Sequence, residues 1–440
     1  MEDTIYTTST QYRLFTYTPQ QLSDLRHATN RAAAEKITAS IRAARAATGS
    51  DADRDDNDAE EEEIDCPTAE EELKLVAYYC VKCMQLSDHF KFPSAVKVHS
   101  EPTQKQATAL TFLHRLYLTT STLTLHPKKL LLPILYLATK TENYYTPIDR
   151  FIATALTAGT TITKDDLLSP EFKIAMGLRW AFQIWHPFRG LEGIFLELNA
   201  MHQGTYASPA RLPGEAEDAK RRLEELVGGA GANEVVARIG RAHGEARAIL
   251  TSTALLTDVY FLYTPPQISF AAFLAADRAL AEMYLDVKFP EGNAAAEATK
   301  RKLLKVVGEC AERHLSGSIT RDTPNPYPGL CLQLPQNGVA TSVLASLDKG
   351  LVKEVTRVDK KLYHVTNRDR KANGNGNGNG NGSGSGSGSG AGRKGERERE
   401  GNYEAGAAEE ERKAKKRRLE REKLARDGDV FGGALHPPQE

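Results

Sequence analysis

Hydrophobic residues recur every three or four positions along most of this chain, which is the period of an amphipathic α-helix. Runs that alternate apolar and polar residues, as a half-buried strand would, are not evident. Two segments, Thr18-Pro19-Gln20-Gln21 and Thr68-Ala69-Glu70-Glu71, place a hydroxyl side chain three positions before a Gln or Glu, which is the pattern of a helix-capping box. The first predicts a helix of about six turns, and the second predicts a core helix.

The same periodicity predicts two further groups of helices and one terminal helix. The first group adds 103–117, 127–141 and 170–182, and the second group has 188–201, 246–263, 266–284 and 294–314. A last apolar stripe, made by Leu351, Val355, Val358 and Leu362, predicts a helix that docks on a core. The predicted fold class is therefore all-α, with two tandem domains of about five helices each and flanking N- and C-terminal helices.

Three stretches of biased composition interrupt the helices. In residues 51–65, ten of fifteen residues are acidic, so repulsion between like charges favours a solvated loop. Residues 204–244 begin and end with turn-forming residues and predict an insertion, and 373–390 repeat Asn-Gly and Ser-Gly, which is typical of a flexible linker. The predicted organisation is an N-terminal segment and helix (1–48), an acidic disordered insertion (49–67), two helical domains (68–186 and 187–316, the second with the insertion), a C-terminal segment with the docking helix (317–371) and a disordered linker with a charged tail (372–440).

Composition argues against several classes of protein. The 57 basic and 58 acidic residues leave a net charge of −1, so no direct nucleic-acid partner is expected. The longest strongly apolar stretch, Leu130–Ala138, is far shorter than the roughly 20 residues of a membrane helix, so no membrane contact is expected. The first residues have neither the basic nor the apolar region of a secretion signal, which favours an intracellular location.

Neither a metal site nor a catalytic site is predicted. The five cysteines are scattered, and Cys80 and Cys83 form a lone CxxC that lacks the further ligands of a zinc site and fits ordinary helix packing. No nucleophile, base and orienting group stand in a recognisable arrangement. We therefore expect no cofactor, no metal and no catalytic residues, and a protein that is not an enzyme.

Several motifs together resemble the first box of the cyclin family. They are FLHRLYL at 112–118, HPKK at 126–129, YLATKTEN at 136–143, and 170–182 followed by His186-Pro187. Within that family, YRLFTY at 12–17 and TDVYFLYTPPQI at 257–268 resemble the cyclin H group. The resemblance covers about residues 12–363 and implies two tandem cyclin boxes.

The resemblance also implies a kinase-binding surface. Lys140 and Glu171 match a Lys and Glu that hydrogen-bond the backbone of the kinase at its mobile helix. The positions that match the groove around them are Leu137, Thr141, Trp180 and Phe182, with Glu142 beside them. By chemistry alone Lys140 and Glu171 could be a surface ion pair worth about 0–1 kcal/mol, and only the resemblance favours the functional interpretation.

Three positions depart from the family pattern. Pro170 directly precedes Glu171, so either a helix begins there with Ser169 as its N-cap, or a longer helix is kinked. His114 stands where the family often has Asp. Pro133 lies inside a predicted helix and would remove one backbone hydrogen bond.

The function implied by the resemblance is that of a non-catalytic subunit that activates a cyclin-dependent kinase. The implied kinase belongs to the kinase-activating module of transcription factor IIH and phosphorylates the C-terminal domain of RNA polymerase II and, in some lineages, other cyclin-dependent kinases. The implied partners are the kinase catalytic subunit, an assembly factor of the ménage-à-trois type and the factor IIH core.

Two alternatives stay open. Lys413, Lys415, Lys416, Arg417 and Arg418 could form a nuclear localisation signal, in line with a nuclear kinase partner, or could belong to a solvated charged helix at 409–426. A general transcription factor resembling factor IIB also has tandem helical repeats, but that family usually carries an N-terminal zinc ribbon and a basic face, and this N-terminus has no pairs of CxxC motifs.

Overall fold

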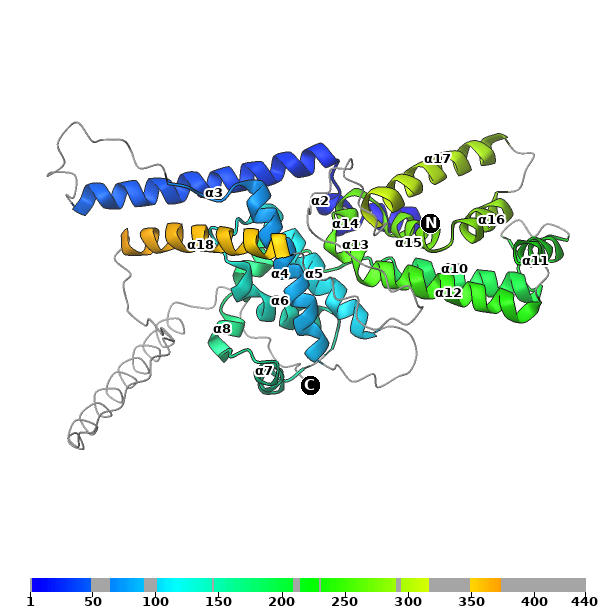
Figure 1. The fold of residues 1–440 in the computed structure, drawn as a ribbon, viewed down its shortest axis with the longest axis horizontal. Coiled ribbons are helices and arrows are strands. Elements are labelled where there is room, and N and C mark those ends of the chain that lie inside the picture. The colour runs from blue at the N-terminus through cyan, green and yellow to red at the C-terminus, as the bar shows by residue number, and fades with distance from the viewer. Residues whose placement is uncertain are drawn as a thin grey trace, which may run out of the picture. The chain divides into compact units, whose positions relative to one another are not determined.

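Helices make up all the regular structure in the described part of the chain (Figure 1). The computed structural model describes residues 2–48, 64–90, 101–144, 146–208, 214–228, 231–289, 294–315 and 349–372. These ranges belong to one compact unit, Met1–Gly376. The all-α fold class is confirmed, whereas the predicted linker beyond residue 372 and the localisation signal lie outside the described residues.

Eighteen α-helices and one π-helical turn follow one another in the described ranges. The N-terminal ones are α1 (Glu2–Thr7), α2 (Thr10–Phe15) and α3 (Pro19–Thr48). Then come α4 (Ala69–His89), α5 (Glu101–Thr119), α6 (Pro127–Thr141), α7 (Ile148–Thr157), α8 (Lys164–Leu168) and α9 (Glu171–Gly177). They are followed by α10 (Phe188–Gln203), α11 (Glu215–Leu226), α12 (Ala232–Thr251), α13 (Thr253–Leu256), α14 (Val259–Leu262), α15 (Pro265–Ala276), α16 (Arg278–Lys288), α17 (Ala294–Cys310), the π-helical turn η1 (Ala311–Leu315) and α18 (Lys349–Ala372).

Both predicted capping boxes are present. The Thr18 amide donates to Gln21 Oε1 at 2.8 Å, and the Gln21 amide donates to Thr18 Oγ1 at 3.2 Å, where α3 begins. Thr68 and Glu71 cap α4 in the same reciprocal way. The prediction of six turns for α3 is wrong, because the helix has 30 residues, about eight turns. Its buried face continues to Ile41, which is 1% exposed.

Three predicted helices differ most from the structure. The helix predicted at 170–182 stops at Gly177, and the one predicted at 246–263 is divided among α12, α13 and α14. α12 begins at Ala232, so part of the predicted insertion belongs to a helix whose residues Val235 and Ile239 are buried. The helix predicted at 266–284 is broken at Asp277, whose carboxylate accepts a hydrogen bond from the Leu280 amide at 3.0 Å and thereby caps α16.

One hydrophobic cluster runs through the helices on both sides of the predicted domain boundary at 186/187. It joins α4, α5 and α6 to α10, α12 and α15, and it includes Leu75, Leu110, Ile134, Leu198 and Phe273. The position of the boundary therefore stays a prediction.

The long helix α3 contacts segments from distant parts of the sequence. The Arg26 guanidinium donates to both carboxylate oxygens of Asp258, at 2.9 and 2.6 Å. Thr29 donates to the Leu118 carbonyl, and Asn30 donates to the Pro67 carbonyl, each at 2.8 Å. α3 thus connects the start of α4, the end of α5 and the segment before α14.

The terminal helix α18 docks beside α3 and α4 as its apolar stripe predicts (Figure 1). Its predicted stripe residues, Leu351, Val355, Val358 and Leu362, are all buried.

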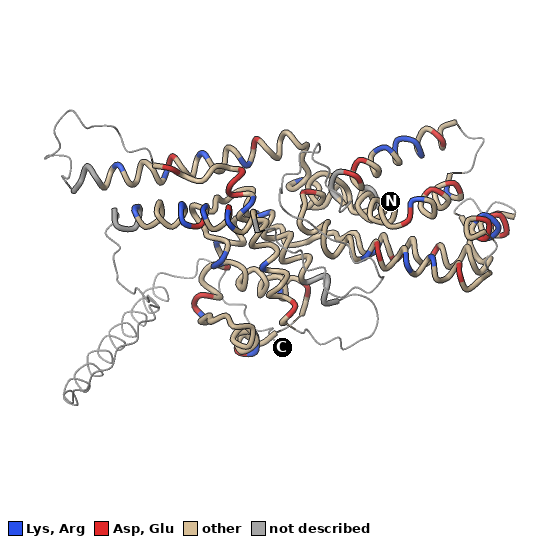
Figure 2. Tube along the Cα trace, in the orientation of Figure 1, with Lys and Arg blue, Asp and Glu red and all other residues tan. Residues whose placement is uncertain are grey.

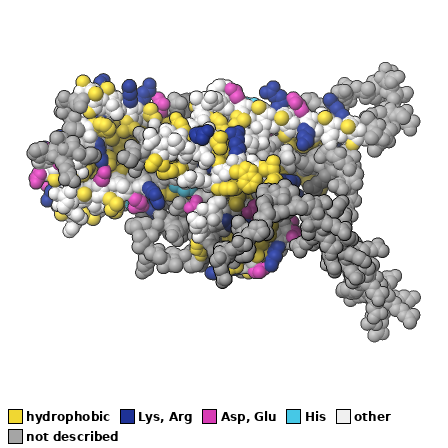
Figure 3. All heavy atoms as spheres, turned by 180° about the vertical axis from the view of Figure 1, so that it is seen from behind, with side chains coloured by type: hydrophobic (Ala, Val, Ile, Leu, Met, Phe, Trp, Pro, Cys, Tyr) yellow, Lys and Arg dark blue, Asp and Glu magenta, His cyan; other side chains and the backbone are white. Residues whose placement is uncertain are grey.

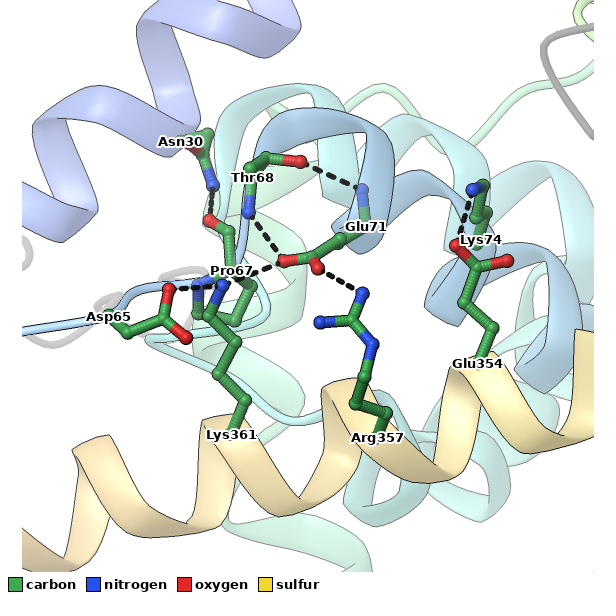
Figure 4. A network of polar contacts seen from close by, with 9 residues as sticks. All are labelled: Asn30, Asp65, Pro67, Thr68, Glu71, Lys74, Glu354, Arg357 and Lys361. Carbon is green, nitrogen blue, oxygen red and sulfur yellow. Dashed lines mark hydrogen bonds and ion pairs between the residues drawn. The ribbon is translucent and has the colours of Figure 1, made fainter.

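Ion pairs fix α18 against the start of α4 (Figure 4). Glu71 accepts hydrogen bonds from Arg357 at 2.5 Å and Lys361 at 3.1 Å, and Lys74 donates to Glu354 at 2.6 Å. Burial acts to raise the pKa of Glu71, but the Thr68 amide and the two cations outweigh it and hold the pKa below its ordinary value. The docking of the last described helix is therefore specified by charge as well as by apolar contact.

Candidate functional site

The first half of the candidate site lies at the end of α6. The His126 imidazole caps this helix by accepting a hydrogen bond from the Lys128 amide at 3.1 Å, and Pro127 occupies the first turn. The helix continues through Pro133 without interruption. Lys140 lies in the last turn, where its positive charge is favoured by the helix dipole.

The second half lies at the start of α9. Ser169 ends the short helix α8, Pro170 is the N-cap residue of α9, and Glu171 is the first helical residue. The helix therefore begins at Glu171, as in the first of the two alternatives, although the N-cap is Pro170 and not Ser169. An acidic side chain in the first turn is favoured by the helix dipole.

Lys140 and Glu171 meet at the surface. Lys140 Nζ donates to both carboxylate oxygens of Glu171 at 2.8 Å, and it lies 4.7 Å from the centre of the Tyr136 ring. The side chains are 40% and 34% exposed. Because an ammonium has three donors and a carboxylate about four acceptor positions, each group can still bond to a partner while keeping the other in place.

Three of the predicted groove residues around this pair are partly or wholly covered by the chain itself. Leu137 is only 5% exposed and packs in the main core. Thr141 is half-buried and donates to the Ala138 carbonyl at 3.1 Å. Glu142 is also half-buried and accepts a hydrogen bond from the Thr108 hydroxyl at 2.5 Å. These three residues support the end of α6 from within the fold.

Apolar side chains reach solvent along α9 and just beyond it. Trp180 is 58% exposed, and its ring centre lies 5.8 Å from Phe172 and 6.2 Å from Phe182, both edge-on. Phe172 is 64% and Met176 is 56% exposed. We call Phe172, Met176, Trp180 and Phe182 the aromatic patch. Large apolar groups that gather in solvent mark an interaction surface more often than singly exposed ones.

Trp180 and Phe182 were expected from the family resemblance, whereas Phe172 and Met176 were not. A signal was available, because these two residues are spaced i, i+4 on a helix whose other side already buries Ile174 and Ala175. A short helix that is apolar on two sides indicates that both sides are covered in the working protein. In the isolated chain, the side with Phe172 and Met176 is exposed, so a partner would have to cover it.

A glycine sets how closely α9 approaches α5. A β-carbon added at Gly177 would lie 2.3 Å from Leu116 Cδ1, and the Gly177 carbonyl accepts a hydrogen bond from Thr119 at 2.9 Å. The close contact fixes the position of α9 and therefore of Glu171.

Several polar residues are buried on α4 and α5, the helices that pack against α6. His114, which replaces the Asp frequent in the family, faces the Leu255 carbonyl at 3.0 Å and Cys80 Sγ at 3.6 Å. Burial lowers the pKa of His114 to about 4, so the imidazole is neutral near pH 7.

Cys80 and Cys83 are buried in the helix packing. Within the described ranges, no group of three or more His, Cys, Asp or Glu side chains could hold a metal ion.

Charge and hydropathy on the rest of the surface are mixed. Figure 2 shows acidic and basic residues interspersed along the described helices, with a short basic run, Lys300–Lys302, in α17. The face seen in Figure 3 carries hydrophobic side chains that gather between charged ones. No helix among the described residues is long and apolar enough to span a membrane.

Comparison with known proteins agrees with the motifs. A family model described as the cyclin C-terminal domain matches residues 186–313. Cyclin CCL1 of Saccharomyces cerevisiae is 30% identical over 304 residues, which cover 68% of this chain and 64% of that protein. Cyclin mcs2 of Schizosaccharomyces pombe is 27% identical over 221 residues, 50% of this chain and 55% of that protein. The matches thus span less than two thirds of either relative's length.

A solved structure resembles this chain over most of its length. A chain in the structure of the CAK complex from Chaetomium thermophilum bound to ATP-gamma-S superposes with a TM-score of 0.55 at 26% sequence identity. The match covers 87% of this chain and 99% of the other. The chain is therefore similar to cyclins, and residues 186–313 match the cyclin C-terminal domain, in line with the resemblance that its motifs predict.

Proposed function

We propose that this chain is the non-catalytic regulatory subunit that binds and activates a cyclin-dependent kinase of the kinase-activating module of transcription factor IIH. The observation that carries the proposal is the exposed Lys140–Glu171 pair next to the aromatic patch. A polar anchor beside a large apolar surface is the composition of a protein-binding hot spot. The resemblance to a chain of a CAK complex supports the choice of partner.

The proposed activity follows from what a protein kinase needs for phosphoryl transfer. An ion pair between a lysine on a strand and a glutamate on a mobile helix, and a metal-binding aspartate, must be aligned inside the kinase. Lys140 would donate to backbone carbonyls at the base of that helix, and Glu171 would accept from backbone amides. The aromatic patch would bury apolar side chains of the same helix and hold it inward.

The wider assignment rests on the same partner. The kinase would phosphorylate the C-terminal domain of RNA polymerase II, and an assembly factor of the ménage-à-trois type and the factor IIH core would complete the assembly. Phosphorylation of the polymerase would take place in the nucleus, and the basic segment Lys413–Arg418 is the candidate localisation signal. The factor IIB-like alternative has no specific observation in its favour, because the relatives reported above are cyclins.

A charge-swap experiment tests the site. In the double variant Lys140→Glu, Glu171→Lys the two side chains can still pair with each other, but each presents the wrong charge to the kinase backbone. We expect the affinity for the purified kinase catalytic subunit to fall at least about tenfold, or ~1.4 kcal/mol, with a matching loss of kinase activation. Binding would be measured by calorimetry, and activation by phosphorylation of a peptide from the polymerase C-terminal domain.

A matched control is available in the same region. Lys164 and Asp149 form another exposed pair, at 2.7 Å, with side chains 57% and 77% exposed. Exchanging these two residues changes the surface charges in the same manner away from the proposed contact. If the Lys140–Glu171 exchange leaves binding and activation as intact as this control does, the site assignment is wrong.

A further inference from the structure

Four helices end with the same backbone hydrogen bonds but not with the same kind of residue. In each, the amide of the residue in the left-handed position donates to the carbonyl three residues before it, and the next amide donates to the carbonyl five residues before it. α6, α7 and α10 place Asn143, Gly159 and Gly204 at the left-handed position, which suits these residues. α9 places Arg179 there, followed by Trp180, with φ angles of 53° and 57°.

This end of α9 is strained. A residue with a β-carbon in the left-handed region costs roughly 1–2 kcal/mol, and two occur in succession here. Such a conformation persists only where the surroundings hold it. Glycine would relieve the strain at position 179, so an arginine at that position indicates that its side chain has a role.

The side chain of Arg179 reaches the N-terminal segment. Its guanidinium carbon lies 5.9 Å from the centre of the Phe15 ring at the end of α2. The guanidinium carbon of Arg115 lies 4.3 Å from the same ring. Phe15 and Arg115 are each only 1% exposed, so water weakens the contact between them little. Arg179 is exposed, so its contact with the ring is the weaker of the two.

A second set of bonds holds the residue after Trp180. The buried Arg115 donates to the Ala181 carbonyl at 2.9 Å and to Gln11 Oε1 at 3.2 Å. Gln11 Oε1 also accepts a hydrogen bond from the Trp185 amide at 2.7 Å. Phe15 and Ala181 belong to a small separate hydrophobic cluster. The turn that carries Trp180 is thus held at both ends by α2 and Arg115.

We propose that Phe15 and Arg179 are positioning residues through which α2 holds the strained end of α9, so that Trp180 lies beside Phe172 and Phe182 before a partner arrives. This inference rests on the proposed function only in that the aromatic patch is taken as the surface that binds the kinase. A pre-arranged aromatic side chain loses less rotational freedom on binding, which increases affinity without a new contact.

The first test needs no partner. The chain has two tryptophans, so Trp185→Phe leaves Trp180 as the sole indole fluorophore, and the Trp185 amide that bonds Gln11 is kept. In this background, Arg179→Ala and Phe15→Ala should increase the amplitude of fast local motion in the fluorescence anisotropy decay of Trp180. Arg179→Lys, which keeps a cation, should restore part of the original decay. Arg13→Ala, an exposed change on α2, should leave the decay unchanged.

Arg179 is exposed, so its variants should fold even if Phe15→Ala does not. An unchanged Trp180 anisotropy decay in folded Arg179→Ala would overturn the proposal.

The second test separates this inference from the proposed function. Arg179→Ala should weaken kinase binding about threefold to tenfold, and it should have no further effect once Trp180→Ala has been made. If Trp180→Ala weakens binding while Arg179→Ala changes neither binding nor anisotropy, the positioning role is wrong and the docking surface stands. If Trp180→Ala leaves binding unchanged while Arg179→Ala loosens Trp180, the positioning role stands and the docking surface is wrong.

Discussion

Two ion pairs in this molecule each make two hydrogen bonds but have different surroundings. Arg26 and Asp258, 232 positions apart, make two hydrogen bonds, and their side chains are 15% and 5% exposed. Lys140 and Glu171, 31 positions apart, also make two, at 40% and 34% exposure. Removing one partner of a buried pair leaves an unpaired charge in the protein interior, whereas water can hydrate the remaining partner of an exposed pair. The buried pair therefore holds the fold, and the exposed pair is available to another protein.

Breaking the buried pair should have the largest effect on stability. Arg26→Ala takes the guanidinium away from the buried Asp258 carboxylate, so we expect the free energy of unfolding to fall by about 3–5 kcal/mol. Urea denaturation followed by circular dichroism measures the free energy of unfolding, and Lys140→Ala in the exposed pair is the control. Equal losses in the two variants would contradict the comparison.

The next largest effect should come from the glycine that positions Glu171. Gly177→Ala brings a methyl group against Leu116 Cδ1, so we expect a loss of about 1–3 kcal/mol of unfolding free energy and a displaced α9. Gly193, inside α10, has open space around its added β-carbon. Gly193→Ala should therefore stabilise by up to about 1 kcal/mol, because alanine favours helix. A loss of similar size in both variants would show that steric contact is not the reason.

The ion pairs that Glu71 makes with Arg357 and Lys361 predict a pH dependence. The folded state lowers the pKa of Glu71, so the carboxylate stabilises the fold above the ordinary glutamate pKa, and this contribution is lost as the pH falls through the lowered value. Glu71→Gln should cost about 1–2 kcal/mol of unfolding free energy at pH 7 and less at pH 3. Denaturant titrations of both proteins at the two pH values measure the difference. If the stability lost in Glu71→Gln became larger as the pH falls, the predicted direction of the pH dependence would be wrong.

The exposed pair should matter least for stability. Lys140→Ala and Glu171→Ala should each change the unfolding free energy by less than about 1 kcal/mol, with a coupling energy that decreases in high salt. A double-mutant cycle at low and high salt measures this. Coupling of several kcal/mol that does not depend on salt would mean that the pair belongs to the core.

The parts of the fold and site that local signals determine could be predicted from the sequence. The bounds of α6 agree to the residue because Pro127 fixes its start, and the capping boxes locate α3 and α4. The proximity of Lys140 and Glu171 was expected only through the family resemblance, since periodicity does not say which helix ends meet.

The predicted helix bounds are wrong where residues distant in the sequence determine the local structure. The apolar period continues past Gly177 to Phe182, but Arg115 binds the Ala181 carbonyl and α9 stops earlier. The glycines before Ala232 predicted an insertion, yet α12 begins there because its residues Val235 and Ile239 are buried in the main core. Neither result follows from a window of neighbouring residues.

The docking of α18 on α4 has a consequence for synthesis of the chain. Lys74 and its partner Glu354 are 280 positions apart, so at about 5–20 residues per second α4 leaves the ribosome roughly 15–60 s before its covering helix exists. During that interval the residues that Val355 and Val358 later cover face solvent. We therefore expect the nascent protein to present a temporary apolar surface for chaperones, which the finished protein covers.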